Sequence, residues 1–512
     1  MSAHLPMLPI VLPLAAGAVL LLAGSRLSLA WRRGLALAAT LALLPVAVAL
    51  LAGAAGGDYR VYAVGDWPAP FGIVLVVDRL AAAMLFVTAF VAACAQLHAT
   101  AGDDETGPHF HALFQFQLLG INGAFLTGDL FNLFVFFEIL LISSYTLLLH
   151  GLGPARVRAA IQVVVLNLTG SALFLFAVGL LYAATGTLNL ADLARVVPTL
   201  GADTVPLARS GALLLLVVFA LKAALLPLGL WLPQSYSAAS AAVAAVFALL
   251  TKVGVYAILR VFPLAFGPEA GALADVAAPW VLPAALATLA FGALGVLAAR
   301  ALREAAGWLV VYSVGTLLVA IGLFSEAGYA AAVYYTAHST LVSAALFLLA
   351  DVVARQRGAG GDRLDVVDSM PQAGLLGSLF IVAAVAMAGL PPLTGFAGKI
   401  MILDAARDSG LAVVIWGVLL VAALVVIVAL ARAGSALFWR IADGNAAHGA
   451  RPRIPLRSLA PIGLLLGMIV AMVAWGGSVT AYAWSTAGQL ARPAAYVEAV
   501  LGTAADDRRS LR

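Results

Sequence analysis

Charged residues are scarce in this sequence, and their scarcity decides its class. Only 10% of the 512 residues are charged and 64% are hydrophobic, which gives a mean hydropathy of +1.07. A soluble chain carries roughly 25% charged residues, so an ordinary soluble domain is excluded. The net charge of +4 lies mostly between the apolar runs, which indicates an orientation signal rather than a nucleic-acid-binding patch.

Cysteine is nearly absent. The single cysteine, Cys94, excludes a disulfide framework and any cysteine-ligated iron–sulfur cluster or zinc site. The seven histidines are scattered, which argues against haem, so no cofactor and no bound metal are expected. No cleavable signal is expected either, because the first apolar run is long enough to span a membrane and has no basic segment before it.

Long apolar runs fill most of the chain. A helix needs about 20 residues to cross the ~30 Å hydrocarbon layer of a membrane, and about fourteen runs reach that length. We therefore predict an all-α polytopic membrane protein. The runs lie near 5–24, 34–53, 79–99, 110–128, 130–150, 160–184, 210–231, 240–262, 277–299, 307–324, 327–353, 374–403, 411–438 and 458–482.

The arginines are distributed unevenly between the two sides of these runs. Loops after odd-numbered runs hold fourteen arginines, and loops and run ends on the other side hold six. Arginine-rich loops stay in the cytoplasm, so both termini are predicted to lie outside. The acidic stretch Asp103–Asp104–Glu105 then falls on the cytoplasmic side.

The segments between the runs are short. Residues 54–78 alternate enough to predict either a short hairpin on the outside or a lateral segment, and NLADLARVV within 186–209 predicts a short helix along the membrane surface. The loops 355–372 and 441–457 are polar or basic. None is large enough for a soluble catalytic domain, so a transporter is expected rather than an enzyme.

Lysine is the rarest basic residue, and its positions are unusual. Against 25 arginines the chain has three lysines, Lys222, Lys252 and Lys399, all inside strongly apolar stretches. Arginine stays protonated, whereas a desolvated lysine ammonium loses its proton readily. Ionisable groups inside a membrane usually serve function, so this pattern predicts proton handling by buried amines.

Glu138 and His338 are two further titratable residues inside apolar runs. Glu138 lies eight residues into LFNLFVFFEILLISSYTLL and could pair with Lys222, either to conduct protons or only to lock two helices together. His338, in YYTAHSTLVSAALFLLAD, could pass protons between amines or simply bond to a neighbouring helix. Asp351, Asp129, Asp78 and Asp404 fall at run ends, where a boundary role is expected.

Prolines interrupt two of the runs that carry a lysine. Pro227 and Pro233 follow Lys222, while Pro391, Pro392 and Gly395 precede Lys399. Proline removes a backbone donor and clashes with the previous helical turn, so both helices are predicted to be broken. Interrupted segments in corresponding halves point to inverted repeats around a midplane ion path; the alternative is that these prolines merely kink core helices.

These residues carry a resemblance to a known family. The stretch from Lys222 through WLPQSYSAAS to LLTKVGVYAILR, with GLPPLTGFAGK and ALFLFAVGLLYAATGTLNLADL, resembles the proton-translocating antiporter-like subunits. These are shared by respiratory complex I, membrane hydrogenases and the multisubunit Mrp-type cation/proton antiporters. FVFFEILLISSYTLL, LPQSYSA and LLTKVGVY are most similar to the D-type subunits of the Mrp (Pha/Mnh) antiporters. The resemblance covers about residues 70 to 440.

The resemblance implies fourteen helices with two five-helix inverted repeats. It divides the chain into N-terminal helices at 1–109, repeats at 110–262 and 277–438, and a final helix with its tail at 458–512. Carried over by position, Glu138 is the helix-5 acid, Lys222 its helix-7 partner, Lys252 the central helix-8 lysine and Lys399 the helix-12 lysine. His338 and water would bridge between them.

Two departures from the family pattern stand out. Many relatives have a lysine shortly after the His338 position, where this chain has Val342–Ser343–Ala344. The proline-rich element after WLP is replaced by Ala238–Ala239–Ser240–Ala241. The first departure leaves hydroxyls or water to carry the proton past that point, and the second predicts a less rigid connection between helices 7 and 8.

The resemblance also implies a function. It predicts a proton-translocating subunit of a multisubunit Na⁺(K⁺)/H⁺ antiporter in a bacterial cell (inner) membrane, working with A-, B-, C-, E-, F- and G-type subunits. Two alternatives stay open. One is a proton-pumping subunit of a complex I-type or membrane hydrogenase redox complex, and the other is a structural membrane scaffold.

Overall fold

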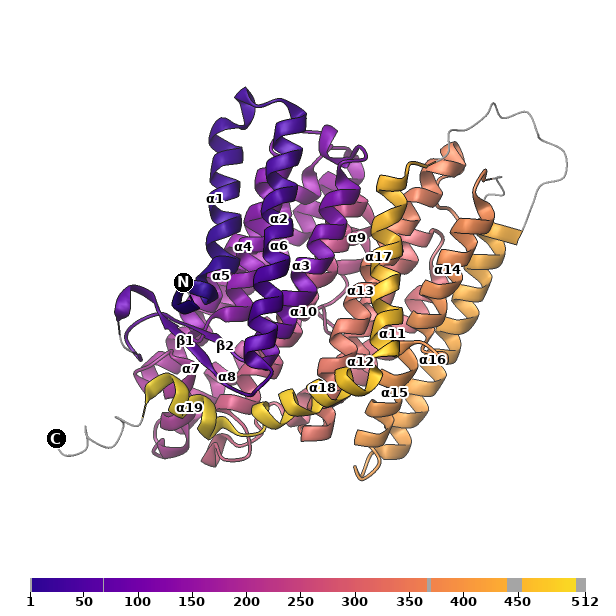
Figure 1. Ribbon diagram of the computed structural model, residues 1–512. Helices are drawn as coiled ribbons and strands as arrows, with labels where there is room; N and C mark the ends of the chain where they lie inside the picture. Colours follow the sequence, from indigo (N-terminus) through magenta and orange to yellow (C-terminus); the bar gives the residue numbers. More distant parts are fainter. Residues whose placement is uncertain (1, 68, 366–369, 440–453, 503–512) are drawn as a thin grey trace.

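The computed structural model describes residues 2–67, 69–365, 370–439 and 454–502. Within these ranges the chain is helical almost throughout (Figure 1). The first half contains α1 (Leu8–Ala23), α2 (Leu29–Ala54), β1 (Arg60–Ala63), β2 (Val74–Val77), α3 (Arg79–Ala99), α4 (Phe110–Leu126), α5 (Leu130–Leu149), α6 (Pro154–Thr185), α7 (Leu190–Val196), α8 (Val205–Ala223), α9 (Leu232–Ala238) and α10 (Ala241–Ala265). The second half contains α11 (Ala278–Ala298), α12 (Leu302–Ile321), α13 (Glu326–Arg357), α14 (Ala373–Ala388), α15 (Thr394–Ala405), α16 (Ala412–Gly434), α17 (Leu456–Ala474), α18 (Gly476–Leu490) and α19 (Pro493–Leu501).

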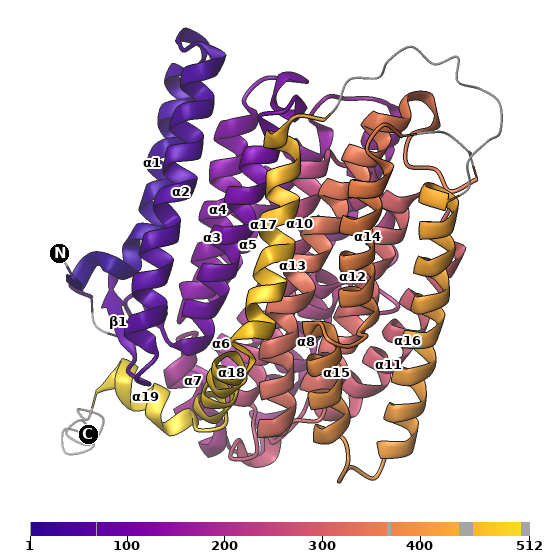
Figure 2. The same cartoon turned by 45° about the vertical axis from the view of Figure 1, so that its right-hand side comes forward.

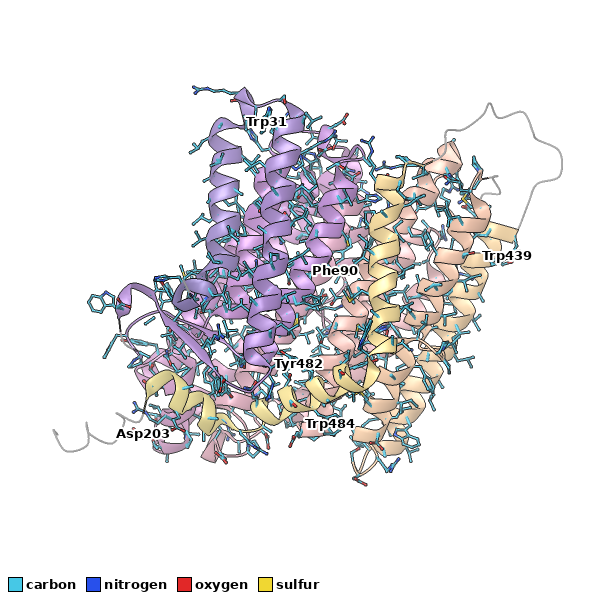
Figure 3. All side chains as sticks on the ribbon, viewed as in Figure 1. Trp31, Phe90, Asp203, Trp439, Tyr482 and Trp484 are labelled. Atoms are coloured by element: carbon cyan, nitrogen blue, oxygen red, sulfur yellow. The ribbon has the colours of Figure 1, made fainter. Side chains whose placement is uncertain are left out.

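The predicted polytopic helical architecture is confirmed. Twelve helices in the described ranges are long and apolar enough to cross a membrane. Two predicted spans differ in form: α4 has 17 residues, and the run 374–403 is divided into α14 and α15. Exposed Trp31 and Trp484 lie at opposite ends of the bundle (Figure 3), as expected for aromatic side chains at membrane–water interfaces.

The last predicted span, 458–482, is wrong as a single helix. α17 ends at Ala474, and after Trp475 the chain turns into α18, which runs across the end of the bundle (Figures 1 and 2). Two adjacent glycines, Gly476 and Gly477, follow this turn, and small residues of this kind commonly accompany sharp kinks. The apolar run is therefore longer than the helix that crosses the bundle.

The helix α18 ties the end of the chain to the start of α3. The Tyr482 hydroxyl donates to the backbone oxygen of Arg79 at 2.7 Å, and the Gln489 side-chain oxygen accepts from the Arg79 backbone N–H at 3.2 Å. The Gln489 amide nitrogen donates to the backbone oxygen of Gly57 at 2.8 Å. Residues near the two ends of the sequence are thus joined at one end of the bundle.

The small extramembrane elements agree with their predictions. β1 and β2 form the antiparallel hairpin predicted for 54–78, with Arg60 opposite Val77, and α7 is the predicted short helix. The hairpin, the first described residues and α19 gather at the same end of the bundle (Figure 1), where His4 bonds the Tyr62 hydroxyl at 3.1 Å. The predicted loop 441–457 lies largely outside the described residues.

Three helices, α10, α12 and α13, make up the centre of the bundle. Every residue of α10 is buried, which fits a helix that is apolar on all sides. Small residues let it approach its neighbours closely: a Cβ added to Gly254 would lie 2.5 Å from the backbone nitrogen of Ala223 and 2.8 Å from the carbonyl carbon of Lys222. α10 and α8 are therefore packed backbone against backbone where the first lysine lies.

Both predicted helix breaks are confirmed. α8 ends at Ala223, after which Ala224 takes the left-handed conformation with φ 62°, and helix resumes at Leu232. α14 ends at Ala388, Gly389 has φ 80°, and α15 begins at Thr394.

Neighbouring side chains satisfy the backbone freed by the first break. Leu226 N–H donates to the Thr288 hydroxyl at 2.8 Å, and the Trp231 indole donates to the Leu221 carbonyl at 3.3 Å. Broken backbone at membrane depth is tolerated where protein or water satisfies it in this way. Pro227 lies within this break, Pro233 near the start of α9, and Pro391 and Pro392 within the second break.

A buried ion pair joins α3 to α10. Asp78 caps the start of α3, accepting from the Ala81 N–H at 2.9 Å, and receives both terminal nitrogens of Arg260 at 2.6 and 2.7 Å. Arg260 Nε also contacts the Tyr256 hydroxyl at 3.2 Å, which donates to the Phe125 carbonyl. Asp78 was predicted as a boundary residue, and the structure adds this partner.

Candidate proton-translocation site

Lys222 lies in the last turn of α8, directly before the first break. Its Nζ donates to the Asn167 side-chain oxygen at 3.2 Å and to the Asn167 backbone oxygen at 3.4 Å. The ammonium also lies 5.9 Å from the centroid of the Phe137 ring, an arrangement in which the ring face attracts a cation. Both partners are neutral, so the buried amine is held by oxygen dipoles and an aromatic ring.

Glu138 does not form a direct ion pair with Lys222 in the described part of the chain. Its half-buried carboxylate accepts instead from the Ser171 hydroxyl. Ser171 and Asn167 are four residues apart on α6, so they share one face of that helix. The acid and the amine therefore each bond to a polar side chain on the same face of α6, one helical turn apart.

A small cavity of about 20 Å³ lies beside Lys222. Ser144, Asn167, Ser235 and Tyr236 contribute to its polar lining, and the buried Tyr236 hydroxyl has no hydrogen-bond partner among the described residues. A polar cavity of at least roughly 10–15 Å³ can hold one water molecule. The space next to the amine therefore fits a water that would join the Tyr236 hydroxyl to it.

Lys252 and Lys399 are connected through α12. The Lys252 Nζ donates to the Ser313 hydroxyl at 3.0 Å. On the neighbouring residue of α12, the Tyr312 ring centroid lies 5.2 Å from the Lys399 Nζ. Lys399 also donates to the carbonyl of Ala388, which is the last residue of α14. The carbonyl end of a helix carries partial negative charge, so the second break supplies an acceptor for a buried cation.

His338 lies on α13, one of the three central helices, and its side chain contacts α15, the helix that carries Lys399. Its Nδ1 is 2.7 Å from the hydroxyl of Thr394, the first residue of α15. Its Nε2 is buried and has no hydrogen-bond partner in the part of the chain that the structure describes, as is also true of the Ser343 hydroxyl further along α13. Buried polar atoms normally have a hydrogen-bond partner, so these two groups fit a chain of water molecules where relatives have a lysine.

Gly395 permits this contact by allowing α15 to approach α14 and α13. A Cβ at this position would lie 1.9 Å from the Ala386 carbonyl oxygen and 2.9 Å from His338 Nε2.

We predict that Gly395→Ala lowers the melting temperature of the protein, because overpacking costs about 1–3 kcal/mol. The matched control is Gly467→Ala on α17, where an added Cβ meets nothing within 4 Å. Equal melting temperatures for the two variants would contradict the steric argument.

All five titratable residues singled out in the sequence thus lie on helices that meet inside the bundle. The structure links Glu138 to Lys222 through α6, and Lys252 to Lys399 through α12. Sequence reasoning missed the polar residues that make the connections: Asn167, Ser171, Ser313 and Thr394. Their signal was available, because amides and hydroxyls inside apolar spans commonly bond across helices.

The aspartates predicted at run ends have capping or pairing roles. Asp129 caps α5 by accepting from the Asn132 N–H at 2.8 Å, and burial raises the pKa of its carboxyl. Asp404 pairs with Arg407 at 3.0 Å on an exposed surface. Asp351 contacts three basic side chains, those of His98, Arg303 and Arg355.

Comparison with known proteins agrees with this architecture. Residues 127–427 match the family model described as "NADH:quinone oxidoreductase/Mrp antiporter, TM". The chain is 40% identical to the D-type subunit of a probable K(+)/H(+) antiporter of Rhizobium meliloti (strain 1021), with 97% of each covered. It is 34% identical to the D-type subunit of an Na(+)/H(+) antiporter of Alkalihalophilus pseudofirmus, covering 97% of this chain and 99% of that one.

A solved structure supports the same assignment. A chain of the Mrp complex from Dietzia sp. DQ12-45-1b superimposes with a TM-score of 0.86 at 27% identity, covering 98% of this chain and 99% of that one. The fold and buried polar site define a polytopic membrane subunit of the antiporter-like class. The chain belongs to the NADH:quinone oxidoreductase/Mrp antiporter family.

Proposed function

We propose that the chain is the D-type, proton-conducting subunit of a multisubunit Na⁺(K⁺)/H⁺ antiporter of the Mrp type. The observation that carries this proposal is the set of three buried lysines, each bonded to a neutral oxygen within the bundle. A purely structural charge would be paired, since a buried unpaired charge is costly. The relatives named as D-type subunits of K⁺/H⁺ and Na⁺/H⁺ antiporters support the substrate class.

The proton route proposed here follows these polar side chains and the close helix contacts between them. From Glu138 it passes through Ser171 and Asn167 to Lys222, then across the close contact between α8 and α10 to Lys252. Ser313, Tyr312 and the region around His338 lead on to Lys399. Protonating one amine repels charge on the next: two unit charges 4 Å apart interact by about 4 kcal/mol at an effective dielectric of ~20. Each step therefore drives the following one.

The topology follows from the same proposal. Residues 110–262 and 277–438 form two repeats of five spans, and in each the fourth span is the broken one, α8/α9 and α14/α15. The arginine-rich ends face the cytoplasm and both termini lie outside, in a bacterial cell membrane. A-, B-, C-, E-, F- and G-type subunits complete the assembly, and inward proton movement drives the cation out.

The test is antiport in everted vesicles from a host that lacks its own Na⁺(K⁺)/H⁺ antiporters. The complete subunit set should collapse a pH gradient when Na⁺ or K⁺ is added, and omission of this chain should abolish the response. Glu138→Gln should slow antiport about tenfold, the effect of losing about 1.4 kcal/mol of coupling. Glu498→Gln, an exposed change on α19, is the matched control. Normal exchange without this chain would overturn the proposal.

The family description also covers NADH:quinone oxidoreductase subunits, which makes a redox complex the second candidate. A subunit of such a complex would move protons through the same buried groups, but electron transfer would supply the energy for proton pumping. Purification of the assembled complex distinguishes the two, because a redox complex would carry iron–sulfur subunits. Their presence, together with no cation-dependent proton movement, would favour this candidate.

A further inference from the structure

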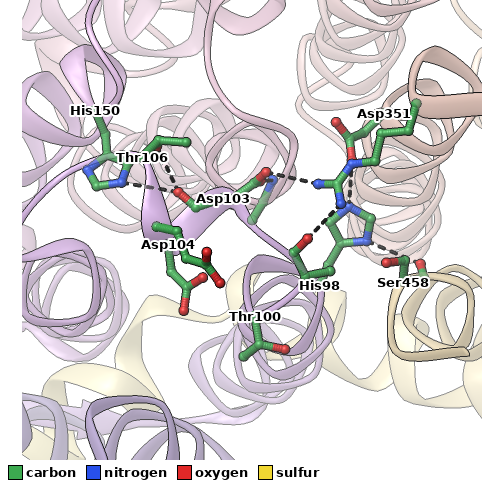
Figure 4. A network of polar contacts seen from close by, with 12 residues as sticks. His98, Thr100, Asp103, Asp104, Thr106, His150, Asp351 and Ser458 are labelled. Atoms are coloured by element: carbon green, nitrogen blue, oxygen red, sulfur yellow. Dashed lines mark hydrogen bonds and ion pairs between the residues drawn. The ribbon is translucent and has the colours of Figure 1, made fainter. Parts of the chain in front are cut away.

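We propose that His98 and Asp351 form a proton-holding pair through which the chain exchanges protons with water at its arginine-rich end. His98 lies at the end of α3 and Asp351 in the last turns of α13, and their side chains meet with His98 Nε2 3.1 Å from Asp351 Oδ2. The other ring nitrogen, Nδ1, is 3.2 Å from the backbone oxygen of Ser458 on α17. Figure 4 shows the imidazole held between these two partners.

The partners of the ring require a shared proton. A backbone carbonyl only accepts hydrogen bonds, so Nδ1 carries a proton. The Nε2···Oδ2 contact then needs a second proton, which belongs either to a doubly protonated imidazole or to a protonated Asp351 carboxyl. Without that proton two lone pairs would face each other. One exchangeable proton is therefore held between His98 and Asp351, and releasing it breaks this hydrogen bond between α3 and α13.

The two side chains differ in their exposure to water, and this difference decides from which side water reaches the shared proton. The His98 side chain is completely buried, whereas that of Asp351 is 14% exposed. Water therefore reaches the shared proton from the Asp351 side, and the imidazole faces the protein. The pair lies at the same end of the bundle as the loop after α3, which the proposed orientation places in the cytoplasm.

Charged groups from several elements surround the pair. Arg355 Nε contacts Asp351 Oδ2 at 2.6 Å, and Arg303 on α12 lies 3.8 Å from Oδ1. Arg355 also donates to Asp103 Oδ1 at 3.2 Å. With the shared proton in place, Arg303, Arg355 and that proton face the carboxylates of Asp351 and Asp103, and Arg156 lies within electrostatic reach of Asp103. Loss of the proton lowers the charge of the cluster by one.

The cluster reaches the helix that carries Lys252. Asp103 Oδ2 accepts from the N–H of Ala242 at the start of α10 at 3.1 Å. Burial, and then the nearby Asp351 carboxylate, raise the pKa of Asp103. A change of charge on the pair therefore acts on Asp103 through Arg355, and so on the start of α10, ten residues before Lys252. The role of the pair in proton exchange rests on the proposed proton-conducting function, whereas the contacts of the pair do not depend on it.

A second histidine–aspartate pair nearby provides a contrast. His111 Nε2 lies 3.0 Å from Asp104 Oδ2, but its Nδ1 faces the Gln96 amide at 2.7 Å, so a neutral ring satisfies both partners. Burial opposes ionisation of Asp104, yet hydrogen bonds from Arg33 and His111 outweigh it and lower the pKa of Asp104 to about 2. The geometry of this pair therefore requires no extra proton between the two side chains.

The experiment compares His98→Gln and Asp351→Asn with His111→Gln in the complete antiporter complex. Glutamine and asparagine keep a hydrogen bond but cannot titrate, so both test variants should slow antiport by about tenfold or more. One titration step should also disappear from the pH profile of the rate. His111→Gln should keep the wild-type profile. Amounts of assembled complex, measured in the same membranes, identify any variant that fails to fold.

Solid-state NMR of ring-¹⁵N-histidine-labelled complex tests the proton directly. The resonance that His98→Gln removes should change with pH in the wild type, and Asp351→Asn should shift its midpoint. A His98 ring that stays in one state at every pH, or equal effects of His98→Gln and His111→Gln on the profile, would overturn the proposal. If His98 titrates but the wild-type complex performs no antiport, the proposed function fails while the pair stands.

Discussion

Lys222→Ala is expected to abolish cation-dependent proton movement while the complex still assembles. The substitution removes the amine that joins α6 to the α8 break and leaves the Asn167 side-chain oxygen without its donor. It keeps the backbone of α8, whose close contact with Gly254 depends on main-chain atoms rather than on the lysine side chain. Everted vesicles should therefore show no antiport, and the amount of complex in the membrane should stay near the wild-type level.

Lys222→Arg separates proton transfer from charge alone. Arginine preserves the positive charge but does not release its proton in proteins. A proton-conducting amine predicts that this variant is as inactive as Lys222→Ala, whereas a purely structural charge predicts that it works. Normal antiport in Lys222→Arg would contradict the assigned role. Arg407→Ala, which removes an exposed ion pair, controls for loss of a cation elsewhere.

Asp78→Ala is expected to destabilise the protein by about 3–5 kcal/mol, the typical cost of removing one partner of a buried ion pair. Arg260 is 5% exposed, so its guanidinium would remain charged inside the bundle beside the neutral side chains of Tyr256 and Tyr496. The start of α3 would also lose its cap, because Asp78 accepts from the Ala81 N–H. Thermal unfolding of the purified complex should show a large drop in melting temperature.

Two further variants check the source of this effect. Asp78→Ala combined with Arg260→Met should recover part of the lost stability, because replacing both charges by apolar groups removes the unpaired cation. Asp404→Ala breaks a pair in which the Arg407 and Asp404 side chains are 68% and 60% exposed, and exposed pairs contribute about 0–1 kcal/mol. A single variant, Asp78→Ala, with the wild-type melting temperature would show that the pair does not stabilise the fold.

The sequence was most informative about elements whose cause is local. Apolar length predicted the spans, and proline with glycine predicted the breaks after Lys222 and before Lys399, because these residues act on their own backbone. Alternation predicted the hairpin formed by β1 and β2. The end of α17 was misplaced because apolar character continues beyond Trp475, although the backbone turns there. Hydropathy reports the environment of a residue and not the direction of its helix.

The connections within the site depend on partners far apart in the sequence. Lys222 and Asn167 are separated by 55 residues and His98 and Asp351 by 253, so only the fold brings them together. The charges of Glu138 and Lys222 predicted a direct contact between them. In the structure, neutral side chains of α6 bond to each instead: Ser171 to Glu138 and Asn167 to Lys222. Asp351 resembled a helix-end residue because two of its three basic partners, His98 and Arg303, come from α3 and α12, and only the fold brings them to it.

The clasp between α18 and the start of α3 has a consequence for biosynthesis. The backbone N–H of Arg79 donates to Gln489, which is translated 410 residues later. Contacts between residues so far apart in the sequence form late in folding. The start of α3 therefore reaches its full set of contacts only after α18 has been synthesised. A chain that stops before α18 leaves the Arg79 N–H without this acceptor and the Arg79 carbonyl without the Tyr482 hydroxyl.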